Sequence, residues 1–118
     1  MKDLFKIDFE FMGQSVNLQI KNYLYDNLKE VQIFLLNEDY DSEAIFYKKR
    51  DNEKTLYIIF KEDNYKKPYW YSHELLHAIK YLCNSLNIND EEVECYMLGF
   101  LMREYTDNLQ KMDSEFIK

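Results

Sequence analysis

The segment FKIDFEFMGQSVNLQI, residues 5–20, has the clearest structural pattern in the chain. Apolar residues alternate with charged residues through its first half and with polar residues through its last five positions. This alternation is typical of half-buried β-strands. Met12-Gly13-Gln14, between the two halves, can turn the chain. The first twenty residues therefore predict a β-hairpin with one face in the core.

After this hairpin the spacing between apolar residues along the chain changes. Over residues 24–37 the apolar side chains recur at helical spacing, with charged and polar residues between them, which predicts a helix. The runs 44–48 and 55–60 are rich in Ile, Phe and Tyr, and the polar segment 51–54 separates them. They predict a second hairpin.

The last part of the chain is helical in pattern. Pro68 suits a helix start, and the periodicity predicts a helix from Tyr69 to about 84–86. After a turn, Asn89 is the expected N-cap of a last helix from Asp90 to about Leu109. The order ββαββαα predicts an α+β fold, in which a small antiparallel sheet carries helices on one face and the chain ends in a helical hairpin.

The composition of the chain limits the folds and the functions that it can have. The 118 residues are 47 % hydrophobic and 17 % aromatic, which predicts one folded domain over residues 1–118. The formal net charge of −7 argues against a nucleic-acid partner bound through its phosphates. Gly13 and Gly99 are the only glycines, too few for a Gly-rich phosphate loop.

The sequence also predicts a compartment. Its apolar runs are shorter than the roughly 18 residues that span a membrane, and the first residues lack a signal-peptide core. We therefore expect a cytoplasmic protein without a membrane partner. Cys83 and Cys95 are then expected as reduced thiols inside helices, each behaving as a small hydrophobic residue.

The segment His73-Glu74-Leu75-Leu76-His77 is an H-E-x-x-H sequence on the predicted helix. Residues four apart lie one turn apart on the same face, so both imidazoles can reach one metal ion. On the helical wheel Leu76 falls within the broad apolar arc, whereas His73, Glu74 and His77 lie opposite it, which argues against two histidines buried in the core. Glu74 can take a proton from a water held at a zinc ion and pass it to a leaving amine. The alternative is a pair of exposed histidines without a metal.

The third ligand is left open by the residues themselves. Glu91, Glu92 and Glu94 lie at the start of the last helix, which a short turn brings back beside the metal helix. Periodicity does not choose between them, and a Cys95 thiolate is a further option. Glu92 has a structural alternative, because a Glu three residues after the cap Asn89 often closes a capping box.

The motif at 73–77, followed by Glu92-Val93-Glu94-Cys95-Tyr96-Met97-Leu98-Gly99, resembles the small gluzincin-type zinc peptidases of phages and mobile elements. Their pattern is H-E-x-x-H, a short turn, then E-x-x-x-Y on the next helix, and the resemblance covers about residues 70–106. It implies a minimal zincin-like domain with Glu92 as the third zinc ligand. It also implies a catalytic role for Tyr96, as an orienting donor or an oxyanion stabiliser.

The chain departs from such families at particular positions. Cys95 stands where a small Ala is more usual. The chain is also loosely similar to ImmA/IrrE-type peptidases, whose Glu-bearing helix ends in a Leu-Met run. Here Leu101-Met102 lacks the Pro that commonly follows, and Arg103 stands instead.

The leading prediction is therefore a zinc-dependent metallopeptidase acting on a protein or peptide. The hairpin at 44–60 is expected either to offer a sheet edge to an extended substrate or to serve only as core sheet. Tyr69-Trp70-Tyr71 either lines a substrate cleft or packs the helix start. The alternative function is a non-catalytic zinc-containing module that binds a basic protein surface, favoured by the small size and the charge of −7.

Overall fold

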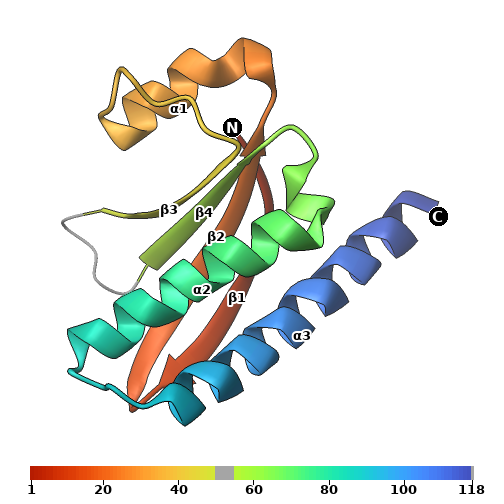
Figure 1. Cartoon of the computed structure of the whole chain (residues 1–118). Helices are drawn as coiled ribbons and strands as arrows, with labels where there is room; N and C mark the ends of the chain where they lie inside the picture. The colour runs from red at the N-terminus through yellow and green to blue at the C-terminus, as the bar shows by residue number, and fades with distance from the viewer. Residues whose placement is uncertain (50–54, 118) are drawn as a thin grey trace.

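The computed structural model describes residues 1–49 and 55–117, and of residues 115–117 only the backbone. The elements follow one another as β1 (Lys2–Phe11), β2 (Gln14–Tyr23), the 3-10 turn η1 (Tyr25–Asn27), α1 (Leu28–Leu35), β3 (Ala44–Lys48), β4 (Thr55–Lys61), the 3-10 turn η2 (Asn64–Lys66), α2 (Pro68–Ser85) and α3 (Glu91–Ile117) (Figure 1). The predicted order ββαββαα and the α+β class are confirmed. The segment 51–54, predicted to separate the strands of the second hairpin, lies outside the described residues.

The four strands form one sheet in the order β1-β2-β4-β3. Both hairpins are antiparallel, but β2 pairs with β4 in parallel, with Ile20 opposite Ile58. The predicted antiparallel sheet is therefore wrong, and the sheet is mixed. The reason lies in β4, whose run from Ile58 to Phe60 is buried throughout. Such a strand must be covered on both faces, so it takes a central position and leaves β3 at the edge.

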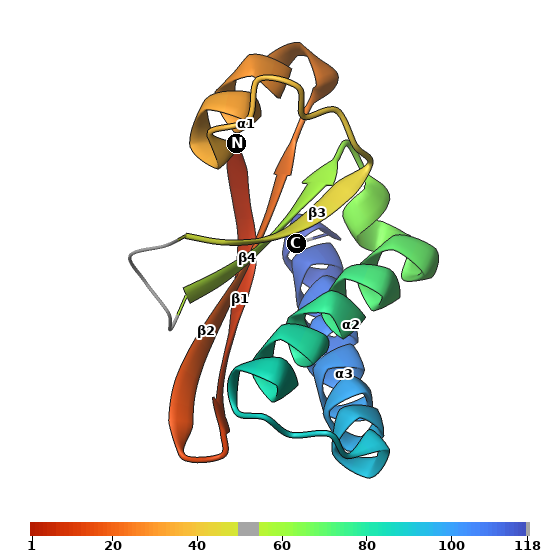
Figure 2. The same cartoon turned by 60° about the vertical axis from the view of Figure 1, so that its left-hand side comes forward.

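The two faces of the sheet are covered by different helices. In both views α2 and α3 lie together on one side of the sheet, whereas α1 lies at its far end (Figures 1 and 2). The alternating residues Ile7, Phe9 and Phe11 of β1 are buried in the core beneath α2 and α3. On β4, Ile59 points the other way and packs with Val31 of α1. The predicted inward face of the first hairpin is thus confirmed.

Several predicted helix details need correction. The first helix begins at Leu28 rather than at residue 24, because Leu24 and the turn η1 precede it and Leu24 is exposed. Leu76, placed on the apolar arc of α2, is exposed. Cys95, expected to behave as a small hydrophobic residue inside the last helix, is also exposed, and Met97 is buried in that region instead. Both cysteines are free thiols, and Cys83 is buried as expected.

The chain entry into α3 also differs from the prediction. The helix begins at Glu91, and the side chain of Asp90 accepts a hydrogen bond from the backbone N–H of Glu92 at 2.9 Å. Asp90 is therefore the N-cap, in place of Asn89, and Glu92 is the second residue of the helix rather than the third. The capping box predicted for Asn89 and Glu92 thus fails for lack of its cap. None of the helices in the described ranges combines the length and the apolar character needed to cross a bilayer.

Tyr105 joins α3 to the other elements of the core. Its ring is fully buried, stacks on Tyr71 of α2 at 4.5 Å between centroids, and meets Phe5 of β1 edge-on. Its hydroxyl donates a 2.6 Å hydrogen bond to the backbone carbonyl of Tyr65, next to the start of α2. Burial raises the pKa of this phenol, so the hydroxyl stays a donor at all ordinary pH values.

We expect Tyr105→Phe to lower the free energy of unfolding by about 1–2 kcal/mol, because the part-buried hydrogen bond to the Tyr65 carbonyl is lost while the ring packing is kept. Denaturant unfolding followed by circular dichroism measures the change. Tyr25→Phe, which alters an exposed ring, serves as the control and should leave stability unchanged. Equal stabilities of the two variants would contradict the prediction.

Candidate metal centre

The H-E-x-x-H segment lies in the first half of α2. Pro68 takes the first helical position, where its missing N–H costs nothing. Apart from Glu74, the buried side chains of the helix hold one face against the sheet and α3; they are Tyr71, Leu75, Ala78, Ile79, Leu82 and Cys83. This packing fixes the rotation of α2, and His73 and His77 are left exposed one turn apart, as predicted.

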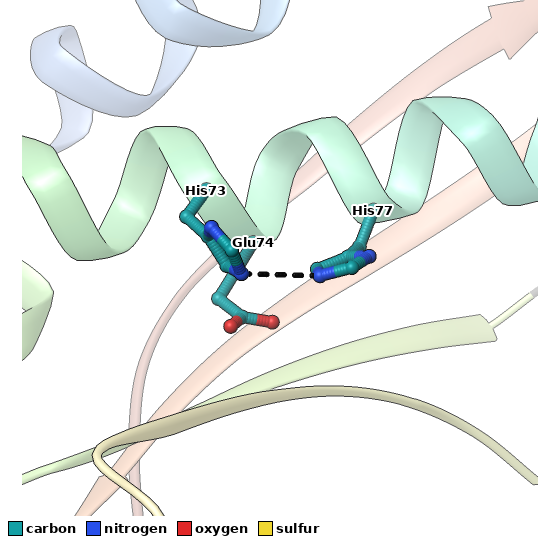
Figure 3. Close-up of side chains that lie close together, drawn as sticks. All are labelled: His73, Glu74 and His77. Carbon is teal, nitrogen blue, oxygen red and sulfur yellow. Dashed lines mark hydrogen bonds between the residues drawn. The ribbon is translucent and has the colours of Figure 1, made fainter.

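The two imidazoles converge on one point. Their Nε2 atoms lie 3.2 Å apart, and both rings point to the side of α2 that faces β3 (Figure 3). Two ligand nitrogens bound about 2.0–2.1 Å from a tetrahedral zinc ion lie about 3.3–3.4 Å apart, so the pair matches the span of one ion. Without an ion, the same contact is a hydrogen bond in which one ring donates to the other.

Glu74 completes the cluster from the buried side of the helix. Its carboxylate and one nitrogen of each histidine all lie within 4.8 Å of one another. Only 4 % of Glu74 is exposed, so its predicted place on the open arc is wrong. The carboxylate turns toward the sheet, where it accepts a hydrogen bond from the backbone N–H of Phe46 in β3. That hydrogen bond makes burial of the carboxylate tolerable.

Opposing influences act on the Glu74 carboxyl. Burial raises its pKa above the ordinary value, while His77, His73 and the Phe46 N–H favour the charged form and offset part of the rise. A raised pKa suits a carboxylate that must both accept and release a proton near neutral pH. The cluster therefore brings two imidazole nitrogens that could hold a metal ion close to a carboxylate that could accept a proton.

The aromatic residues before the motif divide between two roles. Tyr71 is buried against Tyr105, and Trp70 is half-buried against the core, which fits helix-start packing. Tyr69 is exposed, and its ring stacks on His73 with 6.4 Å between centroids and 18° between planes. Of the three aromatic residues, only Tyr69 stacks on a histidine of the cluster, and this contact limits the orientations of the His73 ring.

The structure does not bring Glu92 and Tyr96 to the histidines. Both line a concave surface between α3 and the turn of the first hairpin, beside Phe11 and Met12. Tyr96 is 77 % exposed there. The histidine rings point toward β3, and α3 lies on the other side of α2 (Figures 1 and 3). Among the described residues, the group able to hold a metal comprises His73, Glu74 and His77 alone.

The other predicted ligands also have different surroundings. Glu94 of α3 forms a 2.7 Å ion pair with Lys80 of α2 and so links the two helices of the hairpin. Glu91 and Cys95 are exposed near the start of α3 and lie outside the cluster. The ion pair shows that the predicted helical hairpin brings an acidic side chain of α3 back to α2, although not to the histidines.

The sequence did not predict the contacts that two neighbours, the Phe46 N–H and the Tyr69 ring, make with the site. The Phe46 N–H is a backbone group, so its contact with Glu74 cannot be predicted from the residue type. The contact depends on the packing of β3 against α2. Tyr69 was considered only as a cleft-lining or packing residue. Its spacing of four from His73, the same as that from His73 to His77, is the signal that places all three rings along one helix face.

Comparison of the chain with protein-family models, with curated proteins and with solved structures finds no match to any of them. Its possible function therefore has to be argued from the site itself.

Proposed function

We propose that this chain is a zinc-dependent hydrolase that cleaves peptide bonds. The observation that carries the proposal is the close approach of His73, Glu74 and His77, with the two Nε2 atoms 3.2 Å apart and the carboxylate within 4.8 Å. Two exposed imidazoles beside a buried carboxylate are the residue types that a hydrolytic zinc site uses.

Each residue has a distinct task in this proposal. His73 and His77 hold the ion, which when bound supplies a Lewis acid that polarises water and the substrate carbonyl. Glu74 accepts the proton of the attacking water and returns it to the leaving amine. The Phe46 N–H holds the carboxylate in place, so that the proton acceptor is oriented by the sheet rather than by its own flexible side chain.

An extended protein or peptide segment is the proposed substrate. β3 is an edge strand of the sheet and packs against α2, so a strand added along it would pass close to the histidines. Of the two roles considered for the second hairpin, this arrangement favours a sheet edge for the substrate over core sheet alone. The resemblance to gluzincin-type peptidases supports the same substrate class.

Metal removal and peptide cleavage test the proposal together. We expect the zinc-loaded chain to cleave members of an unstructured peptide library, identified by mass spectrometry. A chelator should stop cleavage and added zinc should restore it, because the imidazoles cannot promote the reaction alone. Cleavage that is indifferent to the chelator, or absent from the zinc-loaded chain, would contradict the proposal.

The second candidate function is a zinc-containing module that binds a protein without cleaving it. It is favoured by the position of Glu92 and Tyr96, which lie away from the cluster, whereas the resemblance assigns them to the reaction. Under this alternative, zinc still binds at His73 and His77, but the peptide library is left intact. The same experiment therefore distinguishes the two functions.

A further inference from the structure

A row of ring-bearing side chains runs along α2 at a spacing of four residues: Tyr69, His73, His77 and Tyr81. Residues at this spacing lie one above another on a helix, about 6 Å apart along its axis. The Tyr69 ring stacks on His73 with 18° between planes, and the His73 ring meets His77 edge-on with 4.8 Å between centroids. The candidate metal centre therefore lies in the middle of the row, and a tyrosine lies at each end.

The two ends of the row differ in exposure. Tyr81 is half-buried, because its ring packs against Phe46 of β3 with 5.8 Å between centroids. Tyr69 is 70 % exposed, yet its ring stacks on His73 and meets Trp70 edge-on at 4.9 Å. An exposed ring that is held by two neighbours has little conformational freedom left to lose when it binds a ligand. The Tyr69 end of the row is thus a rigid aromatic surface beside the histidines.

The outer edge of β3 runs beside this row. The Lys61 N–H donates a 2.9 Å hydrogen bond to the Glu43 carbonyl, at the start of the antiparallel pair of β3 with β4. Successive residues of an edge strand point their backbone groups alternately toward and away from the neighbouring strand, so those of Ala44 and Phe46 point away from β4. The Phe46 N–H accordingly donates to Glu74 of α2. The outer edge of β3 therefore faces the part of α2 that carries the histidines (Figure 3).

The spacing of the row matches that of an extended peptide. Side chains on one face of a β-strand recur every second residue, about 6.4–6.8 Å apart, which is close to the ~6 Å step of the row. Consider a peptide that is paired with the edge of β3 and cleaved beside the two histidines. The side chain that lies level with Tyr69 then belongs to a residue about two positions from the cleaved bond.

The surroundings of Tyr69 favour an aromatic or large apolar side chain at that position. Two aromatic rings in contact gain free energy beyond the area that they bury. A lysine or arginine side chain also binds the face of a tyrosine, but a zinc ion at the neighbouring histidines would repel its charge. An acidic side chain would meet the negative face of the ring.

We propose that Tyr69 is a specificity-determining residue that contacts an aromatic or large apolar side chain of the substrate, about two residues from the cleaved bond. The inference rests on the proposed function, because it concerns a peptide that is cleaved at His73 and His77. It goes further by naming the side chain that the site selects. The competing role for Tyr69 is to orient the His73 ring, which would affect all substrates alike.

Cleavage of a random peptide library by the zinc-loaded chain measures this selectivity. We expect a preference for Phe, Tyr, Trp or Leu about two residues from the cleaved bond. Tyr69→Ala should lose the preference and lower kcat/KM for a Phe-containing peptide by about 10-fold, the upper end of what an aromatic contact contributes. The same peptide with Ala at that position should be cleaved as before. Tyr69→Phe keeps the ring and should keep the preference.

Tyr25→Ala is the matched control, because it removes an exposed tyrosine that lies outside the row and away from α2. It should leave the preference and both kcat/KM values unchanged. Circular dichroism checks that all variants fold. Loss of the preference in Tyr25→Ala as well would show that the selectivity does not come from the Tyr69 ring.

Two further results would overturn the proposal while the proposed function stands. Cleavage with no preference in the unaltered chain, or with a preference that persists in Tyr69→Ala, would show that Tyr69 does not contact the substrate side chain. An equal loss of kcat/KM for the Phe-containing and Ala-containing peptides would show that Tyr69 acts on His73 rather than on the substrate.

Peptide capture separates this inference from the proposed function. Where no peptide is cleaved, the same library is passed over the immobilised zinc-loaded chain and the retained peptides are sequenced. Enrichment of aromatic residues that is lost in Tyr69→Ala would support the Tyr69 contact although the proposed function fails. Retained peptides without this enrichment, the same enrichment in Tyr69→Ala, or no retained peptide would overturn the contact as well.

Discussion

His77→Ala is expected to weaken zinc binding by at least about 100-fold, because even the loss of a group that only orients a metal ligand costs about 10- to 100-fold. The variant leaves one imidazole beside Glu74. It therefore lacks the pair of Nε2 atoms, 3.2 Å apart, that would hold the ion. Isothermal titration calorimetry with zinc measures the affinity. His77 is exposed, so the stability of the metal-free chain should change by no more than about 0.5 kcal/mol.

Glu92→Gln is the matched comparison for this prediction. The resemblance to gluzincin-type peptidases would imply Glu92 as the third ligand, whereas Glu92 here lines a concave surface between α3 and the turn of the first hairpin. The geometry of the cluster predicts that this variant keeps the zinc affinity of the unaltered chain. An equal loss in both variants would instead support Glu92 as a ligand. Unchanged affinity in His77→Ala would refute the metal centre.

Glu74→Gln is expected to lower kcat for peptide cleavage by about 10²- to 10⁴-fold, the range over which a general base contributes. The amide has the shape of the carboxylate, and its oxygen can still accept the Phe46 N–H, but it cannot take up the proton of water. Zinc affinity should stay close to that of the unaltered chain, because His73 and His77 remain. Steady-state kinetics on a cleaved library peptide, together with calorimetry, measures both quantities.

The kinetics of Glu74→Gln can contradict the proposal in two ways. The same rate and product profile as the unaltered chain would show that Glu74 is not the base. Loss of zinc binding together with activity would show that the carboxylate is a ligand instead, which its place within 4.8 Å of both histidines permits. Loss of activity with zinc retained is the result that the proposed mechanism requires.

Much of the fold could be predicted because local periodicity specifies local structure. The alternation of Ile7, Phe9 and Phe11 set the inward face of β1, and these residues are buried as expected. Likewise, the spacing of the two histidines placed both rings on one exposed face of α2. In each case one element alone determines which residues share a face.

Pairing between distant segments could not be read in the same way. The parallel pairing of β2 with β4 depends on which strand is covered on both faces, and that depends on α1, which precedes β4, as well as on α2 and α3, which follow it. The N-cap of α3 is Asp90, one residue after the predicted Asn89. Both residue types are good N-caps, so the backbone path of the turn determines which of the two caps the helix.

The order of elements, the half-buried first hairpin and the pair of histidines one turn apart follow from local sequence patterns, since each depends on residues close together in the chain. The burial of Glu74 against the Phe46 N–H, and the position of Glu92 and Tyr96 on another surface, depend on contacts between distant segments. These positions depend on how α2 is rotated against β3 and α3. That rotation is fixed by the packing of the whole core rather than by any local pattern.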